Sequence, residues 1–518
     1  MKTFEKIILW LLALVLAFSL PLSLVACGNE QPAETGEQMN GENNEEPADD
    51  AAERIGTVSL ADCVIVTAGS PTVAETRTAG MLQKQIYATK GVKLTVCKST
   101  SIIAKNAKGK IVIGPSVCQK AKPEGEHGFA IAGNGNTFEI AANSSYGYEA
   151  ALNYLTRNVI TQSKTMQIDD TVERTGQGTT LLTAQQTHAG EVRFMVNNVY
   201  GYGSDKPMRQ RMKMLLDLYT TYSPDVIGLQ EYHDNPRSIL HPLLTDAGYT
   251  EVKGAGMTNG ASTPLYYKAD VLDLLDCGYL LYTDAQDLDS PAYQTILGSY
   301  TMAQVKVNDD SKSITWGIFR VRETGHVFLA AATHLFYLRD TNVGNDPRDG
   351  IWRRVQAAVA KETVFAAADA YLTREGLETG TMPIFIGGDI NSVVDASAYT
   401  TLQGNSASSS GNYTGANAMT NTNILVPSKE RIKYSTNHHH EGNWDETYEV
   451  FDEPYVAARS AAYESSLDYI FVNSFAVRDA RVDVKYSAAL FDLFAMLATD
   501  HCPVMIDFNL TGAGDDAQ

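Results

Sequence analysis

Short apolar runs alternate with amphipathic segments through most of the chain after residue 190. Two segments, 205–224 and 350–372, carry apolar residues at helical spacing and predict long amphipathic helices. Eight other apolar runs predict buried strands, at 192–200, 225–231, 263–268, 313–321, 327–335, 383–391, 467–473 and 501–510. Many strands with few helices between them favour an α/β fold in which two packed sheets are flanked by helices.

A smaller pattern of the same kind covers residues 57–172. It predicts strands at 63–68, 92–97 and 110–114, a hairpin at 127–142, and helices at 72–91 and 146–159. These elements form a small α+β domain with one sheet and two helices. The pattern resembles the non-catalytic N-terminal domain found ahead of some glycoside hydrolases, which implies an accessory module without chemistry of its own.

The first 56 residues differ from the rest of the chain. Residues 1–26 combine Lys2 and Lys6 with a short apolar run and end before Cys27, which resembles a bacterial lipoprotein signal peptide. The resemblance implies cleavage before Cys27 and lipidation of that cysteine, with an uncleaved membrane anchor as the alternative. Residues 27–56 are acidic and poor in bulky apolar side chains, so we expect a disordered tether. The protein is therefore predicted to be extracytoplasmic and lipid-anchored to a bacterial membrane.

The charge of the chain bears on its binding partners, and its cysteines bear on zinc sites and disulfides. The chain has 41 Lys and Arg against 61 Asp and Glu, a formal net charge of −20, and no basic run. Nucleic-acid sites normally collect Lys and Arg to replace counterions, so nucleic acid is a disfavoured partner. The five cysteines after Cys27 follow no zinc spacing and are expected to be buried thiols, with a disulfide in the first domain as the alternative. A monomer is expected.

Polar side chains stand at one end of six apolar runs in the larger region. They are Asn198, Glu231, His334, Asp389 with Asn391, Asp468, and Asp500 with His501. A single residue of this kind commonly caps a strand or forms a turn, but six separate runs predict that the polar ends converge at one edge of the sheets. Carboxylates and amides without cysteine suit Mg²⁺ or Ca²⁺ rather than zinc. Metal-assisted attack of water on a phosphoester fits such a cluster.

Six motifs occur here in an order that resembles the endonuclease/exonuclease/phosphatase superfamily: VNNVYG, PDVIGLQE, THL, PIFIGGDIN, SLDYIFV and TDHCPV. The resemblance covers nearly all of residues 191–511. It implies a four-layer α/β sandwich, two mixed sheets face to face with helices outside, and an active site at one edge. It also implies phosphoester hydrolysis with Mg²⁺, or with Mn²⁺ or Ca²⁺ as alternatives. Residues 173–190 are then a linker and 512–518 a disordered tail.

Carried over position by position, the resemblance implies the metal side of the site. Glu231 would be the principal metal ligand, Asn198 would lie beside the ion and Asp500 near it. Some relatives carry an acid two residues after the first asparagine as a further ligand. Tyr200 stands at that position here, which argues against a second metal site.

The same resemblance implies the phosphate side. Asp389 would align or activate the attacking water and is the candidate general base. Asn391 would donate hydrogen bonds to the phosphoryl oxygens. Asp468 would pair with His501 and fix its tautomer, so that His501 faces the phosphate. His334 would lie on the leaving-group side.

Two further segments offer candidate substrate contacts. Arg339, Arg348 and Arg353 could clamp an anionic substrate, or they are surface charges at the start of a helix. The insertion from Ser406 to about Ser466 contains three histidines and a glutamate at 438–441. Their spacing fits an exposed substrate-facing loop better than a helical metal site.

These observations favour a metal-dependent phosphoester hydrolase at the cell surface, acting on a small or lipid phosphoester. The membrane tether, the acidic charge and the accessory-domain resemblance support that substrate class. An extracellular metal-dependent endonuclease is the alternative, favoured by the superfamily and disfavoured by the missing basic run. A catalytically retired surface binding protein is the third hypothesis, and it is disfavoured because every motif position keeps its functional group.

Overall fold

The computed structural model describes residues 52–511 except for gaps at 179–183, 204–206, 255–261, 287, 289–290, 310, 338–346, 405–416, 438–443, 449 and 452–461. The predicted signal peptide, the predicted lipidation site Cys27, most of the predicted tether and the tail at 512–518 lie outside the described residues. Within the described residues, no helix has the length and hydrophobicity needed to cross a bilayer. The five cysteines of this part of the chain are free thiols, so the alternative of a disulfide in the first domain is wrong.

The first domain contains a six-stranded sheet in the order β4-β3-β5-β7-β6-β9. Its strands are β3 (Cys63–Thr67), β4 (Thr95–Lys98), β5 (Gly109–Ile113), β6 (Gly128–Asn134), β7 (Thr137–Ala142) and β9 (Glu173–Gln177). Its helices are α2 (Val73–Lys90), α3 (Ile102–Asn106) and α4 (Ser145–Asn158). β6 and β7 pair antiparallel, which confirms the predicted hairpin.

Local signals fix both ends of α2. Thr72 and Glu75 form a capping box, in which each side chain accepts a hydrogen bond from the other residue's main-chain N–H. Gly91 ends the helix with φ of +68°, the left-handed conformation that favours glycine. These groups satisfy main-chain donors and acceptors that the helix itself leaves unpaired.

The limits of this domain differ from those predicted. β1 (Arg54–Ile55) lies in the predicted tether and pairs with β2 (Val58–Ser59) and β8 (Gln167–Ile168) in a small second sheet. β9 lies in the predicted linker and pairs with β6. Both segments are short and largely polar, so the sequence carries no apolar pattern that predicts a strand. They form strands because neighbouring segments supply main-chain hydrogen-bond partners.

Two six-stranded mixed sheets form the centre of the larger domain. The first has the order β12-β13-β11-β10-β23-β22, and the second has the order β14-β15-β16-β17-β21-β18. The first contains β10 (Val192–Asn198), β11 (Val226–Gln230), β12 (Tyr249–Glu251), β13 (Leu265–Lys268), β22 (Val482–Ala489) and β23 (Val504–Leu510). The second contains β14 (Leu272–Leu281), β15 (Ser313–Val321), β16 (Val327–His334), β17 (Ile384–Asp389), β18 (Met419–Asn421) and β21 (Asp468–Asn473). In each sheet one central pair is parallel, β10 with β11 and β16 with β17.

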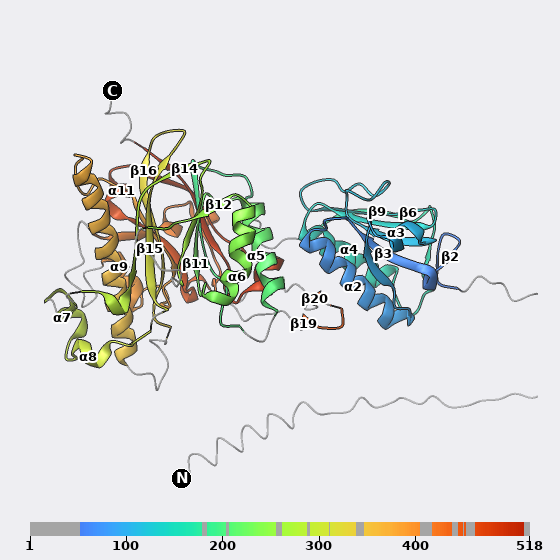
Figure 1. Ribbon diagram of the computed structural model, residues 1–518, viewed down its shortest axis with the longest axis horizontal. Coiled ribbons are helices and arrows are strands. Elements are labelled where there is room, and N and C mark those ends of the chain that lie inside the picture. The colour runs from blue at the N-terminus through green and yellow to red at the C-terminus, as the bar shows by residue number, and fades with distance from the viewer. Residues whose placement is uncertain are drawn as a thin grey trace, which may run out of the picture. The chain divides into compact units, whose positions relative to one another are not determined.

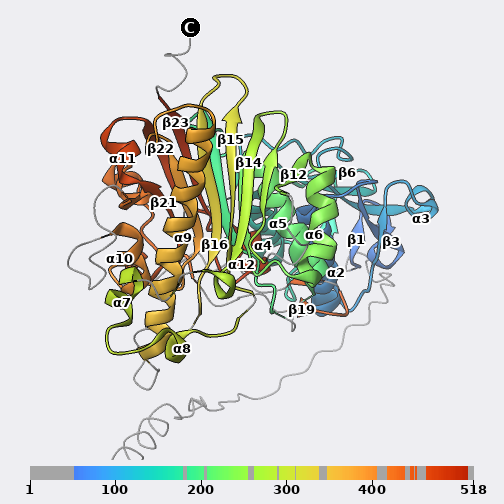
Figure 2. The same cartoon turned by 60° about the vertical axis from the view of Figure 1, so that its left-hand side comes forward.

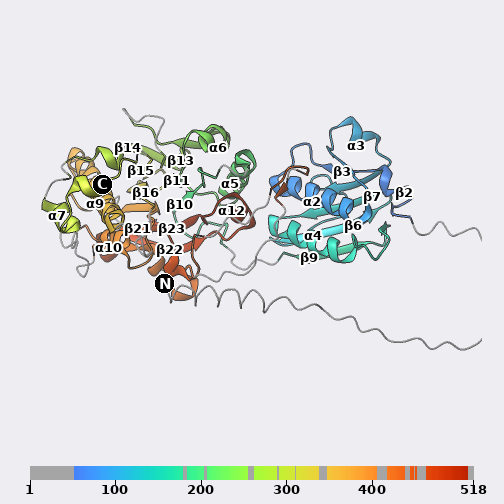
Figure 3. The ribbon, with the colours of Figure 1, turned by 90° about the horizontal axis from the view of Figure 1, so that it is seen from below.

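Apolar side chains fill the space between the sheets, and helices cover their outer faces (Figure 1). Phe328 and Phe385 of the second sheet contact Phe508 of the first, with ring centroids 5.5 and 4.3 Å apart. Figure 2 shows α9 (Pro347–Arg374) along the second sheet. Seen from below, the strands lie between α9 and the helices α5 (Met208–Tyr222) and α6 (Asp234–Asp246) (Figure 3). The predicted four-layer α/β sandwich is confirmed.

The remaining elements of the larger domain are short. They are helices α7 (Pro291–Leu297), α8 (Met302–Val305), α10 (Ser397–Gln403), α11 (Ser474–Arg478) and α12 (Leu493–Ala498), and strands β19 (Trp444–Asp445) and β20 (Val450–Phe451).

A glycine at the end of β17 allows close contact with the neighbouring strand. Gly388 has φ of +139°, and a Cβ atom there would lie 2.0 Å from the carbonyl oxygen of Thr333. Only glycine fits this backbone position. The close approach brings the next residue, Asp389, level with His334 in the strand register.

Candidate active site

Polar side chains from both sheets of the larger domain meet at one edge. In the second sheet, the strand register places His334 beside Asp389, and Asp389 beside Asp468. In the first sheet, Asn198 ends β10, and Glu231 directly follows β11. The Asn198 amide connects the sheets, because its Nδ2 is 3.2 Å from Glu231 Oε1 and 3.1 Å from Asp389 Oδ2. Side chains far apart in the sequence are thus within hydrogen-bonding distance.

Three residues at this edge adopt left-handed backbone conformations that are rare outside glycine. Their φ angles are +52° at Tyr200, +56° at Glu231 and +50° at Asn391. Each lies within two residues of the end of a strand. Such conformations cost about 1–3 kcal/mol each and cluster at functional sites. Backbone strain is therefore concentrated where the polar side chains converge.

Asn198, Glu231 and Asp500 make up the predicted metal side. Burial raises the pKa of Asp500, and the nearby Glu231 carboxylate raises it further against the opposing charge of His501. Asp500 Oδ1 is buried without a hydrogen-bond partner among the described residues, and His501 Nε2 is 4.0 Å away. A divalent cation would give this oxygen a partner and would offset the repulsion between two carboxylates. The residues present therefore fit the predicted cation.

Another set of groups is compact enough to hold a metal. One ligand atom each of Asp389, Asp468 and His501 lies within 4.8 Å of the others. However, His501 Nδ1 is already 2.7 Å from Asp468 Oδ2, and the two carboxylates favour the protonated imidazole. A protonated imidazole has no lone pair to give to a metal. These contacts leave the Glu231 side as the expected position of the cation.

Asp389 is a buried carboxylate with the properties of a general base. Its Oδ1 accepts a hydrogen bond from the Asn391 main-chain N–H at 2.9 Å, and its Oδ2 accepts one from Asn198 Nδ2. Burial raises the pKa of Asp389 to about 7, although the positive charge of His501 opposes this shift. A base transfers protons best when its pKa lies near the working pH. This environment supports the role that the resemblance implies.

Asp468 and His501 form the predicted pair, and a threonine completes it. Asp468 Oδ2 accepts hydrogen bonds at 2.7 Å from both His501 Nδ1 and Thr436 Oγ1. Thr436 is fully buried and belongs to the long insertion. Burial by itself would lower the pKa of His501, but Asp468 and Asp389 raise it well above its usual value. His501 is therefore an imidazolium whose Nδ1 side is fixed, which leaves its Nε2 proton available.

A buried lysine that sequence reasoning missed adjoins His334. Lys312 is 3% exposed, and its Nζ is 2.8 Å from His334 Nε2. His334 Nε2 is in turn 3.2 Å from Asn391 Nδ2 and 3.4 Å from Asp389 Oδ2. Burial and the Lys312 charge hold the pKa of His334 well below its usual value, so the imidazole is neutral. Burial lowers the pKa of Lys312, but Asp389 and Glu231 favour its charged form.

The three candidate arginines differ in position. Arg339 lies outside the described residues, as do the histidines of the insertion at 438–440. Arg348 is exposed in the first turn of α9. Arg353 is 1% exposed, and its Nε donates to the main-chain oxygen of Phe336 at 2.7 Å. This placement does not support a substrate contact for Arg353, because its guanidinium is buried against the chain that follows His334.

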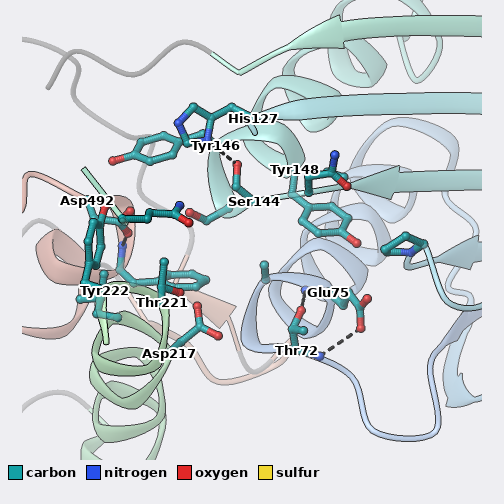
Figure 4. Close-up of a pocket in the computed structure, with 18 residues that line it drawn as sticks. Thr72, Glu75, His127, Ser144, Tyr146, Tyr148, Asp217, Thr221, Tyr222 and Asp492 are labelled. Atoms are coloured by element: carbon teal, nitrogen blue, oxygen red, sulfur yellow. Dashed lines mark hydrogen bonds between the residues drawn. The ribbon is translucent and has the colours of Figure 1, made fainter. Parts of the chain in front are cut away.

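A separate cavity of about 420 Å³ lies away from this cluster (Figure 4). It is lined by residues of α2 and α4 and of α5 and α12, among them Glu75, Asp217 and Asp492. Burial raises the pKa of all three carboxyl groups. Burial, and to a smaller extent the charge of Asp492, raise the pKa of Asp217 to about 6. None of the predicted catalytic residues lines this cavity.

The chain belongs to the endonuclease/exonuclease/phosphatase family, whose sequence model matches residues 198–501. The chemistry common to that family is hydrolysis of phosphoester bonds. No curated protein matches the chain in sequence.

Solved structures of this fold match the chain at low sequence identity. An endonuclease/exonuclease/phosphatase from Bacteroides vulgatus is 19% identical with a TM-score of 0.42, and the match covers 62% of this chain and 99% of that one. A mannosyl-6-phosphatase from Bacteroides thetaiotaomicron is 14% identical with a TM-score of 0.39, covering 61% and 99%. TDP2 from D. rerio, complexed with a single-stranded DNA product, is 15% identical with a TM-score of 0.38, covering 61% and 98%.

Proposed function

We propose that this chain is a metal-dependent hydrolase of a small phosphoester. The family supplies the class of reaction. The observation that carries the proposal is the convergence of Glu231, Asp389 and His501. The Asn198 amide connects the first two, and His501 Nε2 is 3.9 Å from Asp389 Oδ2. A metal ligand, a base and an imidazolium thus lie around one point.

Asn198, Glu231 and Asp500 would hold the cation. Amide and carboxylate oxygens favour Mg²⁺, with Mn²⁺ or Ca²⁺ as alternatives. When bound, the cation withdraws negative charge from a phosphate oxygen and favours attack by water.

The chain's own residues supply the proton transfer and the remaining charge. Asp389 accepts a proton from the attacking water, since its pKa is about 7. His501 keeps a proton on Nε2 and donates a hydrogen bond to a phosphoryl oxygen. His334 Nε2 lies 3.4 Å from Asp389 Oδ2 and 2.8 Å from Lys312 Nζ. There, a positive charge stabilises the oxygen of the departing alcohol.

We also propose that the enzyme acts as an extracytoplasmic monomer, tethered to a bacterial membrane by a lipid on Cys27. The signal-like residues 1–26 and the acidic segment that follows support this location. The net charge of −20 supports a small substrate rather than nucleic acid.

A substrate panel tests the proposed function. The purified chain is incubated with glycerol phosphate, sugar phosphates, nucleotides, phospholipid vesicles and plasmid DNA, with and without EDTA. We expect hydrolysis of a small phosphoester that EDTA abolishes and Mg²⁺ restores, with a loss of about 100-fold or more in Asp389→Asn. The matched control is Asp483→Asn, at an exposed position of β22. Cleavage of plasmid DNA alone would instead assign a nuclease, and hydrolysis of none of these compounds would refute the proposal.

A further inference from the structure

Exposed tyrosines stand at both ends of the row of polar side chains in the active site. Neighbours in the row lie 3.2, 3.1, 3.4 and 2.8 Å apart, in the order Glu231, Asn198, Asp389, His334 and Lys312. Tyr202 adjoins the Glu231 end and is 57% exposed. Tyr337 adjoins the Lys312 end and is 59% exposed. An exposed aromatic residue therefore adjoins each end of this series of contacts.

Tyr202 lies on a turn that packs tightly against the metal side. Its main-chain nitrogen is 3.5 Å from Glu231 Oε2, and its ring centroid is 4.6 Å from that of His233. A Cβ atom on the preceding Gly201 would lie 1.9 Å from the Glu231 carbonyl oxygen. Only glycine permits this approach, which fixes the distance between the tyrosine and Glu231.

A buried arginine holds the same turn from behind. Arg211 is fully buried in α5 and donates hydrogen bonds to the carbonyl oxygens of Val199, Tyr200 and Gly203, at 3.0 to 3.2 Å. Carbonyl groups on both sides of Tyr202 are therefore fixed to the core of the domain. An exposed ring on a fixed backbone loses little further entropy when a ligand stacks on it.

Tyr337 is supported in a similar way. The preceding residue, Phe336, donates its N–H to Gln356 Oε1 at 2.8 Å and accepts from Arg353 Nε at 2.7 Å. Gln356 and Arg353 are both 1% exposed in α9. The Tyr337 ring lies 5.9 Å from Lys312 Nζ, measured to the ring centroid. Arg353, for which the sequence offered a substrate contact as one of two alternatives, positions the chain beside this tyrosine.

We propose that Tyr202 and Tyr337 form a stacking subsite for a ring carried by the phosphoester, as in a sugar phosphate or a nucleotide. This inference rests on the proposed function and defines its substrate class. Tyrosine presents a large apolar face that contacts a sugar ring or a base at little entropic cost. The chain has no basic run that would follow a polymer of phosphates, so the ring belongs to a small molecule.

The test compares ring-bearing with ringless substrates. We would measure kcat/KM of the full chain with Mg²⁺ for mannose 6-phosphate, glucose 6-phosphate, adenosine 5′-monophosphate and glycerol 3-phosphate. Variants are Tyr202→Ala, Tyr337→Ala and the two phenylalanine substitutions. Tyr87→Ala, at an exposed tyrosine of α2 in the first domain, is the matched control. Melting temperatures check that each variant folds.

We expect the wild type to favour a ring-bearing substrate over glycerol 3-phosphate. At least one alanine variant should reduce this preference by about ten-fold, mainly through KM, whereas phenylalanine at the same position should retain it. A preference for the sugar phosphates or for the nucleotide identifies the source of the ring. Unchanged preference in both alanine variants would overturn the stacking subsite and leave the proposed hydrolase intact. Failure of the wild type to hydrolyse any substrate would overturn both.

Discussion

Replacement of Lys312 by methionine tests how one buried charge controls the base. Methionine has a similar length, so it removes the charge while filling most of the space. Lys312 Nζ and Asp389 Oδ2 lie 2.8 and 3.4 Å from the same atom, His334 Nε2, which limits their separation to about 6 Å. With an effective dielectric constant of about 20, Coulomb's law gives about 2.7 kcal/mol at this separation. That energy corresponds to about two pKa units.

The direction of the effect follows from the charges. Lys312 favours the ionised carboxylate, so its removal raises the pKa of Asp389 above its value of about 7. At pH 7 about half of the wild-type base is ionised, compared with about 1% in the variant, so kcat/KM should fall by about 50-fold and recover as pH rises through about 9.

The assay is the pH profile of kcat/KM on the best small phosphoester. Lys312→Arg keeps the positive charge and should keep the acidic limb of the profile near its wild-type position. The Lys312→Met variant should regain the part of its activity that depends on the ionised base at alkaline pH, while the loss of charge beside the departing oxygen remains at every pH. A methionine variant that loses activity equally at every pH, or whose acidic limb does not move, would refute the reasoning.

Two further predictions concern the threonine of the insertion and the separate cavity. Thr436→Val removes the 2.7 Å hydrogen bond to Asp468 and should lower kcat about ten-fold with little change in KM, because His501 is less well oriented. Thr436→Ser should retain activity in the same kinetic assay, and equal losses in both variants would contradict this role. The pKa of Asp217 is raised to about 6 when folded, so ionisation destabilises the fold as pH rises from about 4 through 6. Asp217→Asn should therefore increase the free energy of unfolding by about 1–3 kcal/mol at pH 7.5, with the gain disappearing near pH 4 in urea titrations. A gain that is the same at both pH values would show that its cause is not charge.

Much of the fold and of the site could be predicted because the same pattern, an apolar run that ends in a polar residue, indicates both a buried strand and a functional group. A buried strand needs an unbroken apolar run, and a functional group at its end interrupts that run abruptly. Asn198, Glu231 and Asp389 were visible for this reason, and the strand register then brings them together. The pattern indicated which residues meet, although it could not indicate distances.

Helix α6 and the roles of Lys312 and Thr436 could not be predicted, because their sequences do not follow the usual rules for helices and buried residues. Helix α6 contains Pro236 and Pro242, which read as helix breakers, yet Pro236 lies in its first turn and tertiary packing tolerates Pro242. Lys312 directly precedes β15, and a lysine before an apolar run is usually exposed. Its burial follows from three-dimensional contacts with His334. Thr436 lies in an insertion without strand periodicity, so its contact with Asp468 could be found only from the structure.

Cation binding at Glu231 tests the central claim most directly. Mn²⁺ and Mg²⁺ would be titrated calorimetrically into the metal-free wild type, into Glu231→Gln, and into Glu430→Gln as a control at an exposed glutamate. We expect one bound cation in the wild type and the control. Binding should be at least about ten-fold weaker in Glu231→Gln, and hydrolysis should be lost. Undiminished cation binding and hydrolysis in Glu231→Gln would show that Glu231 does not hold a catalytic cation.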